Sequence, residues 1–122
     1  MTHRILILDD DIPVSDSLAI FLEDEDFEVA QASSAEDALD YLKRRRVDLV
    51  VVDLRLPGMD GQGFISAAKD RWPALKFIVY TGSPEFQIPT AMVQERNVSN
   101  AIFLKPLPEF EPLVHEIRRM LR

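Results

Sequence analysis

Short apolar runs alternate with longer amphipathic stretches along this chain, and that alternation is typical of βα units that build a parallel sheet. The predicted strands are residues 5–8, 27–32, 47–52, 76–80 and 101–104. The third run is almost continuously apolar, as in a strand that helices cover on both faces. The second run includes Glu28 and Gln31, so we expect it at an edge of the sheet.

The stretches between these strands have helical periodicity. Residues 14–24 place apolar side chains at i, i+4, i+7 and i+8, which predicts a helix with one apolar stripe, and Asp11 is its expected N-cap. Ser33 is predicted to open the second helix, with Glu36 placed for a capping box. The third helix is expected to be capped by Asp60 and to end before Pro73.

Two further helices are predicted in the last third of the chain. Residues 88–96 are the only part of 83–100 with helical character, so we expect a short or displaced helix there. The last helix should span about 108–121, since proline is tolerated in a first turn. Five βα units predict the α/β class: a doubly wound, flavodoxin-like sheet of order 2-1-3-4-5 with helices on both faces. We expect residues 1–122 to form one domain.

Charge and composition narrow the classes of function. The net charge of −7 argues against direct nucleic-acid binding, which needs a concentrated positive field. The basic run 43–46 is interpreted as the favourable cationic end of the second helix, and Trp72 as packing at the end of the third. There is no cysteine and no apolar run of membrane-spanning length. We expect a soluble, cytoplasmic protein that does not contact membranes.

Polar side chains follow four of the predicted strands at their carboxyl ends. Asp9 and Asp10 follow the first strand, Asp53 the third, Thr81 the fourth and Lys105 the fifth. Because the carboxyl ends of parallel strands lie at one edge of the sheet, these residues should converge there. Carboxylate and carbonyl oxygens are the ligands that Mg²⁺ prefers, so Asp9, Asp10 and Asp53 predict a Mg²⁺ site. The backbone carbonyl of Arg55 is a further candidate ligand.

These residues are accompanied by LRLPGMDG after Asp53 and by proline after Lys105. The combined pattern resembles the receiver domains of bacterial two-component response regulators, in particular those that are similar to chemotaxis regulators. The resemblance spans residues 4–121. It implies that Asp53 accepts a phosphoryl group from a histidine kinase or a phosphotransfer protein. It also implies that Asp10 and Asp53 bind Mg²⁺ directly, that Thr81 and Lys105 contact the phosphoryl group, and that the Lys105–Pro106 bond is cis.

The resemblance further implies a phosphorylation switch, read by an output protein or domain at the surface of the fourth helix, fifth strand and fifth helix. The family usually has an aromatic residue three positions before the lysine, where this chain has Ile102. Phe103 cannot replace it, because adjacent strand residues face opposite sides. We therefore hypothesise that the signal travels by displacement of residues 83–100. By resemblance, Arg55 and Ser83 tune the phosphoaspartate lifetime.

Two alternatives remain open from the sequence. A phosphatase of the haloacid dehalogenase type also uses a strand-end aspartate, but it resembles this chain less, since such enzymes have a second acid where this chain has Arg55. A pseudo-receiver would retain the fold and switch without phosphate, and Ile102 is compatible with it. We expect no enzyme activity beyond self-phosphorylation and autodephosphorylation.

Overall fold

The computed structural model describes residues 2–82 and 97–122. Its strands are β1 (Arg4–Leu8), β2 (Glu28–Ala32), β3 (Leu49–Val52), β4 (Lys76–Thr81) and β5 (Val98–Leu104). They form one parallel sheet of order β2-β1-β3-β4-β5, which is the predicted topology. The exposed Glu28 and Gln31 belong to an edge strand, as expected.

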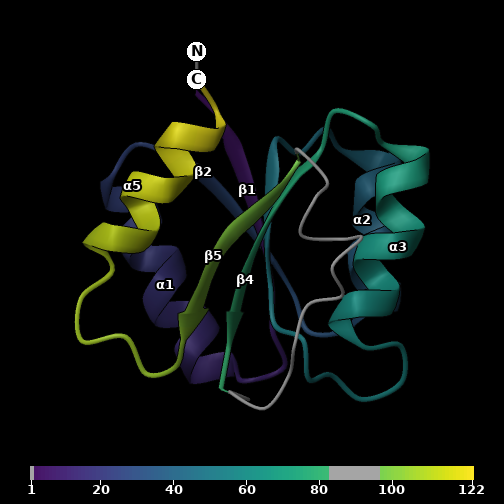
Figure 1. Ribbon diagram of the computed structural model, residues 1–122, viewed down its shortest axis with the longest axis horizontal. Coiled ribbons are helices and arrows are strands. Elements are labelled where there is room, and N and C mark those ends of the chain that lie inside the picture. The colour runs from purple at the N-terminus through teal and green to yellow at the C-terminus, as the bar shows by residue number, and fades with distance from the viewer. Residues whose placement is uncertain (1, 83–96) are drawn as a thin grey trace.

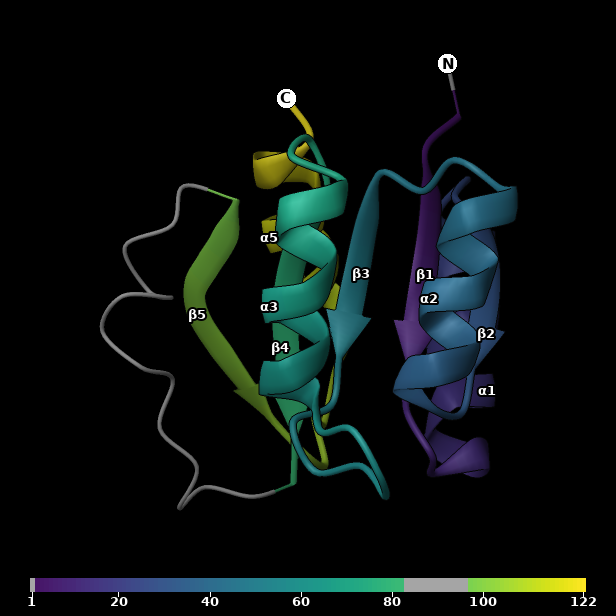
Figure 2. The same ribbon diagram turned by 90° about the vertical axis from the view of Figure 1, so that its right-hand side faces the viewer.

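Four described helices cover the two faces of this sheet. They are α1 (Ile12–Asp24), α2 (Ala35–Arg44), α3 (Gly61–Arg71) and α5 (Glu111–Met120). Figures 1 and 2 show α1 and α5 on one face and α2 and α3 on the other. Within the described part of the chain, no helix is long and apolar enough to cross a bilayer.

Each face of the sheet packs against its own hydrophobic core. Ile5 and Ile7 pack with the apolar stripes of α1 and α5, and Leu6 and Leu8 pack with those of α2 and α3. This is the alternation that the strand geometry imposes. All four residues are buried, and full burial of each contributes about 1.5–3 kcal/mol.

The strand register brings the carboxyl ends of the inner strands level with one another. Leu8 of β1 pairs with Val52 of β3, and Val52 pairs with Val79 of β4. Thr81 at the end of β4 pairs with Leu104 of β5. The polar residues that end or follow these strands therefore start from neighbouring backbone positions.

Side-chain caps set the starts of the helices on this edge. Asp11 accepts a hydrogen bond from the N–H of Val14, and Asp60 accepts one from that of Gly63, so both predicted caps are confirmed. The prediction that Ser33 opens the second helix was one residue early. Ser34 is the N-cap and accepts from the N–H of Asp37 at 3.1 Å, because its extended backbone, and not that of Ser33, precedes the first helical residue.

The last helix begins at Glu111 instead of residue 108. A helix starting at residue 108 would place Pro112 beyond the first turn, where proline lacks the N–H for an i→i−4 bond and its ring collides with the preceding turn. Starting at Glu111 puts Pro112 in the first turn, where no such N–H is required. The predicted helix at 88–96 lies outside the described residues.

The fifth strand is longer than predicted, since it starts at Val98 and not at residue 101. Because Ser99 and Asn100 are polar, the apolar pattern of the sequence does not extend to the start of this strand. Ser99 is nevertheless buried, and its hydroxyl donates to the carboxylate of Glu116 on α5. Arg119 makes two 2.7 Å hydrogen bonds to the same carboxylate. This polar network joins β5 to α5.

We expect Glu116→Gln to reduce the free energy of unfolding at neutral pH by about 1 kcal/mol, since it weakens a charge-assisted network. The hydrogen bonds from Arg119 and then from Ser99 lower the pKa of Glu116 below 4.5. The stabilisation is therefore complete above pH 4.5 and disappears as the pH falls through the lowered pKa of the folded protein. Urea unfolding across this range measures it, with exposed Glu109→Gln as control. Equal stability of the wild type and Glu116→Gln at neutral pH would contradict the role of this network.

Candidate functional site

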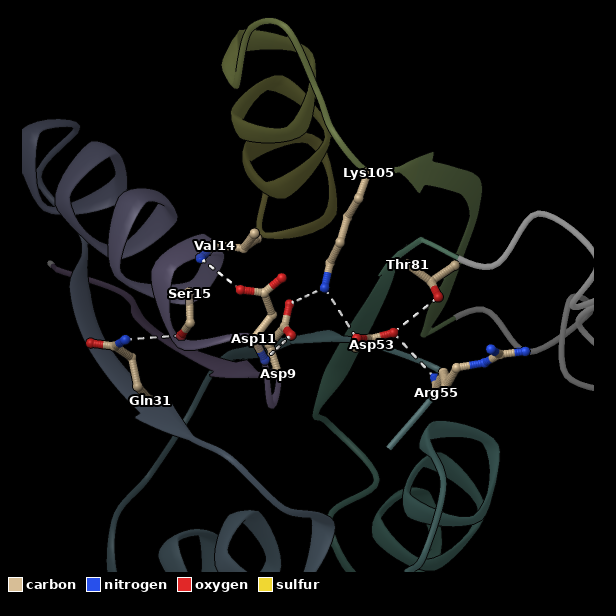
Figure 3. A network of polar contacts seen from close by, with 9 residues as sticks. All are labelled: Asp9, Asp11, Val14, Ser15, Gln31, Asp53, Arg55, Thr81 and Lys105. Carbon is tan, nitrogen blue, oxygen red and sulfur yellow. Dashed lines mark hydrogen bonds and ion pairs between the residues drawn. The ribbon is translucent and has the colours of Figure 1, made fainter. Parts of the chain in front are cut away.

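The polar residues predicted from the strand ends do meet at one edge of the sheet. Asp9 and Asp10 follow β1, Asp53 follows β3, Thr81 is the last residue of β4, and Lys105 follows β5. Figure 3 shows Thr81 and Lys105 directed toward Asp53 from different strands. Asp9, Asp53 and Thr81 are buried, whereas Asp10 is exposed.

Three donors surround the carboxylate of Asp53. The hydroxyl of Thr81 donates to Oδ1 at 2.9 Å, and the backbone N–H of Arg55 donates to the same oxygen at 3.1 Å. The ammonium of Lys105 lies 3.1 Å from Oδ2. Both oxygens of a carboxylate that is only 6% exposed therefore have partners. Asp53 is held in one orientation by groups from three different segments.

Lys105 also binds the second buried carboxylate. Its Nζ lies 2.6 Å from Oδ2 of Asp9, and the backbone N–H of Asp11 donates to Oδ1 of Asp9 at 2.9 Å. The single ammonium thus bridges Asp9 and Asp53 (Figure 3). It compensates part of the negative charge that the fold concentrates here.

Burial and charge shift two ionisable groups of this cluster. Burial raises the pKa of Asp9, and Lys105 only partly reverses this effect. Burial works to lower the pKa of Lys105, but the hydrogen bonds and charges of Asp9 and Asp53 outweigh it and raise that pKa above 10.5. Lys105 therefore remains a fixed positive charge throughout the neutral range.

The backbone around Lys105 sets the position of its ammonium. The Lys105–Pro106 peptide bond is cis, as the resemblance implies, and the N–H of Lys105 donates to the carbonyl of Thr81 at 2.9 Å. The Nζ atom lies 5.7 Å from the ring centroid of Tyr80, within the range of a cation–π contact. The sequence reasoning missed Tyr80 because, as a strand residue, it is indistinguishable from core.

The three acidic residues can be tested as a metal site by their geometry. Asp9, Asp10 and Asp53 each offer a carboxylate oxygen, and these atoms lie within 4.8 Å of one another. An all-oxygen set with one exposed member suits Mg²⁺, which usually binds through one or two carboxylates and keeps several waters. The residues present therefore fit a hard divalent cation.

Arg55, Ile102 and Ser83 are the residues predicted to tune or transmit the signal, and the structure describes the first two. Arg55 contacts Asp53 through its backbone, while its side chain extends away from the carboxylate (Figure 3). Ile102 is 42% exposed, and Phe103 packs on the opposite face, against the core of α1 and α5. The two residues do face opposite sides of β5, as expected. Ser83, and most of the segment 83–100 whose displacement was hypothesised, lie outside the described residues.

Gly61 is a positioning residue that the sequence reasoning did not single out. A Cβ atom at this position would lie 2.4 Å from the carbonyl oxygen of Asp53 and 2.7 Å from the Cα of Leu54. Its N–H donates to the carbonyl of Leu54 at 3.0 Å. The first residue of α3 therefore packs directly on the backbone of the Asp53 loop. The glycine after Asp60 in the PGMDG turn was the available signal.

We expect Gly61→Ala to destabilise the protein by about 1–3 kcal/mol, because the added methyl overlaps backbone atoms that cannot move independently of Asp53. Gly82→Ala is the matched control, since its Cβ would lie 3.9 Å from the side chain of Lys105, an ordinary contact distance. Urea unfolding of the two variants measures the difference. If Gly61→Ala were as stable as Gly82→Ala, the close approach to Asp53 would not constrain the site.

Comparison with known proteins identifies relatives of this chain. The family model described as the response regulator receiver domain matches residues 5–118. The hydrogenase transcriptional regulatory protein HoxA of Cupriavidus necator is 35% identical over 102 residues, which are 84% of this chain and 21% of HoxA. In HoxA and three other curated relatives, the matched stretch covers 21% to 30% of the relative's own length.

Solved structures agree with this match. A CheY-like receiver domain protein from Methanospirillum hungatei is 29% identical, with a TM-score of 0.86 over 99% of this chain and 94% of that one. TrrA of Thermotoga maritima, solved with Mg²⁺ and BeF, has a TM-score of 0.85 over 98% of this chain and all of that one. At 22% identity, that likeness shows the fold alone. The family match favours the receiver domains over the phosphatases considered from the sequence. The chain belongs to the response regulator receiver domain family.

Proposed function

We propose that this chain, as one receiver domain over residues 1–122, accepts a phosphoryl group on Asp53. The observation that supports this most directly is the convergence of Thr81, Lys105 and the acidic residues on one buried carboxylate. A carboxylate is a competent nucleophile toward phosphorus. The three donors around Asp53 hold it in one orientation, which lowers the entropic cost of reaction.

The phosphoryl donor is a histidine kinase or a phosphotransfer protein. A carboxylate oxygen of Asp53 forms the new bond to phosphorus as the P–N bond of the donor phosphohistidine breaks, and the electron pair of that bond leaves with the imidazole. Lys105, held protonated by Asp9 and Asp53, then pairs with a phosphoryl oxygen. The hydroxyl of Thr81, which donates to Asp53 here, donates to another. Transfer of this kind depends on positioning and electrostatics.

Asp10 and Asp53 bind Mg²⁺ directly in this proposal, with Asp9 completing the acidic pocket and the carbonyl of Arg55 as a further ligand. When bound, the ion neutralises carboxylates that would otherwise repel an anionic donor. The spacing of the three carboxylates supports this assignment. Asp10 is the exposed member of the set, so it is accessible to an ion arriving from solvent.

Phosphorylation is converted into a signal by the loss of existing contacts. Thr81 and Lys105, at the ends of β4 and β5, both bind Asp53 in this structure, so redirecting them to a phosphoryl group displaces those strand ends. Ile102 and Leu104 lie two residues apart on β5 and are 42% and 46% exposed. We assign the surface that includes them, together with α5, to contact with an output protein or domain.

Incubation with acetyl phosphate and Mg²⁺ should add one phosphoryl group to the wild type and none to Asp53→Asn, because the amide lacks the nucleophilic oxygen. Intact-protein mass spectrometry measures the adduct. Asp60→Asn is the matched control, since asparagine retains the N-cap of α3 and the change lies outside the acidic cluster.

Absence of the adduct in the wild type has two explanations that beryllofluoride distinguishes. Binding of beryllofluoride to the wild type, but not to Asp53→Asn, would indicate a competent site with rapid hydrolysis. Failure of both reagents would overturn the proposal in favour of the pseudo-receiver, with which Ile102 is compatible.

Asp10→Asn should weaken Mg²⁺ binding by about tenfold or more, because it removes a direct ligand of a site with few protein ligands. Asp11→Asn removes the same charge one residue away while retaining the N-cap of α1, so it should change the affinity much less. Isothermal titration calorimetry measures both. An equal loss in the two variants would indicate general charge attraction instead of coordination.

A further inference from the structure

A groove opens at the end of the molecule opposite Asp53. It has a volume of about 490 Å³ and is lined by residues 42–48 and 71–75, at and just after the C-terminal ends of α2 and α3. Figure 2 shows both helix ends at the amino-terminal edge of the sheet, away from the arrowheads of β1 and β3. None of the residues assigned to the phosphoacceptor site lines this groove.

The groove is strongly basic in an acidic protein. Its lining has five cations and the single acid Asp48, a net charge of +4 against −7 for the whole chain. The cations are Lys43, Arg44, Arg45, Arg46 and Arg71. Arg44 pairs with Asp40 at 3.4 Å and Arg46 approaches Asp48 at 3.8 Å. Among the described residues, no carboxylate forms an ion pair with Lys43, Arg45 or Arg71.

Apolar groups form the floor beneath these charges. Leu42, Val47 and Leu75 line the groove and are buried in the core on the α2–α3 side of the sheet. Trp72 is half-buried there, and the guanidinium of Arg71 lies 4.9 Å from its ring centroid. Arginine and tryptophan are among the side chains enriched in the binding hot spots of interfaces. The attraction between cations and a helix C-terminus accounts for Lys43 and Arg44 at the end of α2. It does not account for a groove that is also lined by a tryptophan.

We propose that this groove binds an acidic peptide segment of a partner protein, one in which carboxylates alternate with apolar side chains. Carboxylates of such a segment would pair with Lys43, Arg45 and Arg71, which have no ion-pair partner among the described residues. Its apolar side chains would pack on Trp72 and the aliphatic floor. Charge complementarity of this kind speeds association and selects the partner.

The helix ends favour dispersed carboxylates over phosphate. Phosphate sites usually use backbone N–H groups at helix N-termini, whereas α2 and α3 present their C-terminal carbonyls here. Those carbonyls carry partial negative charge, which repels a compact dianion near the floor. Long arginine side chains can instead meet separate carboxylates at the rim.

Trp72 is the only tryptophan in the chain, so its fluorescence reports directly on this groove. We would titrate the whole chain with a short capped peptide of glutamate, aspartate, leucine and phenylalanine, and with its glutamine and asparagine counterpart. The acidic peptide should shift the emission of Trp72 saturably, and added salt should weaken binding. The neutral peptide should leave the emission unchanged.

Arg45→Glu should lower the affinity for the acidic peptide by about tenfold, since it replaces an attraction by a repulsion. Arg122→Glu, the same change outside the groove, should leave the affinity unchanged. Both variants should still be phosphorylated on Asp53, which separates this proposal from the proposed function. Circular dichroism checks that Arg45→Glu is folded.

Four results with added peptide or polyphosphate would overturn the proposal. They are an unchanged emission of Trp72 with the acidic peptide, equal binding of the neutral peptide, and equal affinities of Arg45→Glu and Arg122→Glu. The fourth is tighter binding of inorganic polyphosphate than of the peptide, which would identify a phosphate site. Sedimentation without peptide tests a second copy as occupant. If the chain self-associates and Arg45→Glu abolishes that association, the occupant of the groove is a second copy of this chain and not a partner protein.

Discussion

The carboxylates of Asp9 and Asp53 are buried side by side, and the rest of the site depends on how their charge is balanced. An unpaired buried carboxylate costs several kcal/mol, so the fold requires a cation within reach of both. Lys105 meets this need from β5, at 2.6 Å from Asp9 and 3.1 Å from Asp53. The ammonium thereby ties the end of β5 to the ends of β1 and β3. Anything that changes the charge at this edge, a divalent cation or a phosphoryl group, therefore acts on β5 as well.

The parallel sheet gives the molecule two chemically different ends. The strand C-termini carry Asp9, Asp10 and Asp53, while the helix C-termini at the other end carry the basic groove around Trp72. Both follow from the direction of the elements, because helices that run antiparallel to the strands end where the strands begin. Asp11 and Asp60 cap helices at the acidic edge, where negative charge stabilises helix N-termini. The two ends therefore offer separate surfaces for the phosphoryl donor and for the acidic peptide that we propose.

Local pattern predicted most of the fold, and each of its errors has an identifiable physical cause. The strand order and the caps Asp11 and Asp60 are confirmed. Ser34, and not the predicted Ser33, is the N-cap of α2; either serine suits an N-cap chemically, and the backbone conformation decides between them. Residues 98–100 were missed as strand because Ser99 is polar. Its burial depends on Glu116 and Arg119, which lie on a helix that comes later in the chain.

The sequence by itself determined which residues stand at the strand ends and which chemistry they offer, because strand periodicity and turn residues are properties of neighbours along the chain. Only the tertiary structure decided that Lys105 bridges two carboxylates, that Gly61 packs on the backbone of Asp53, and that Trp72 lines a basic groove. These contacts join segments that are far apart in sequence. Their distances depend on strand register, helix packing and side-chain rotamers, which no single segment specifies.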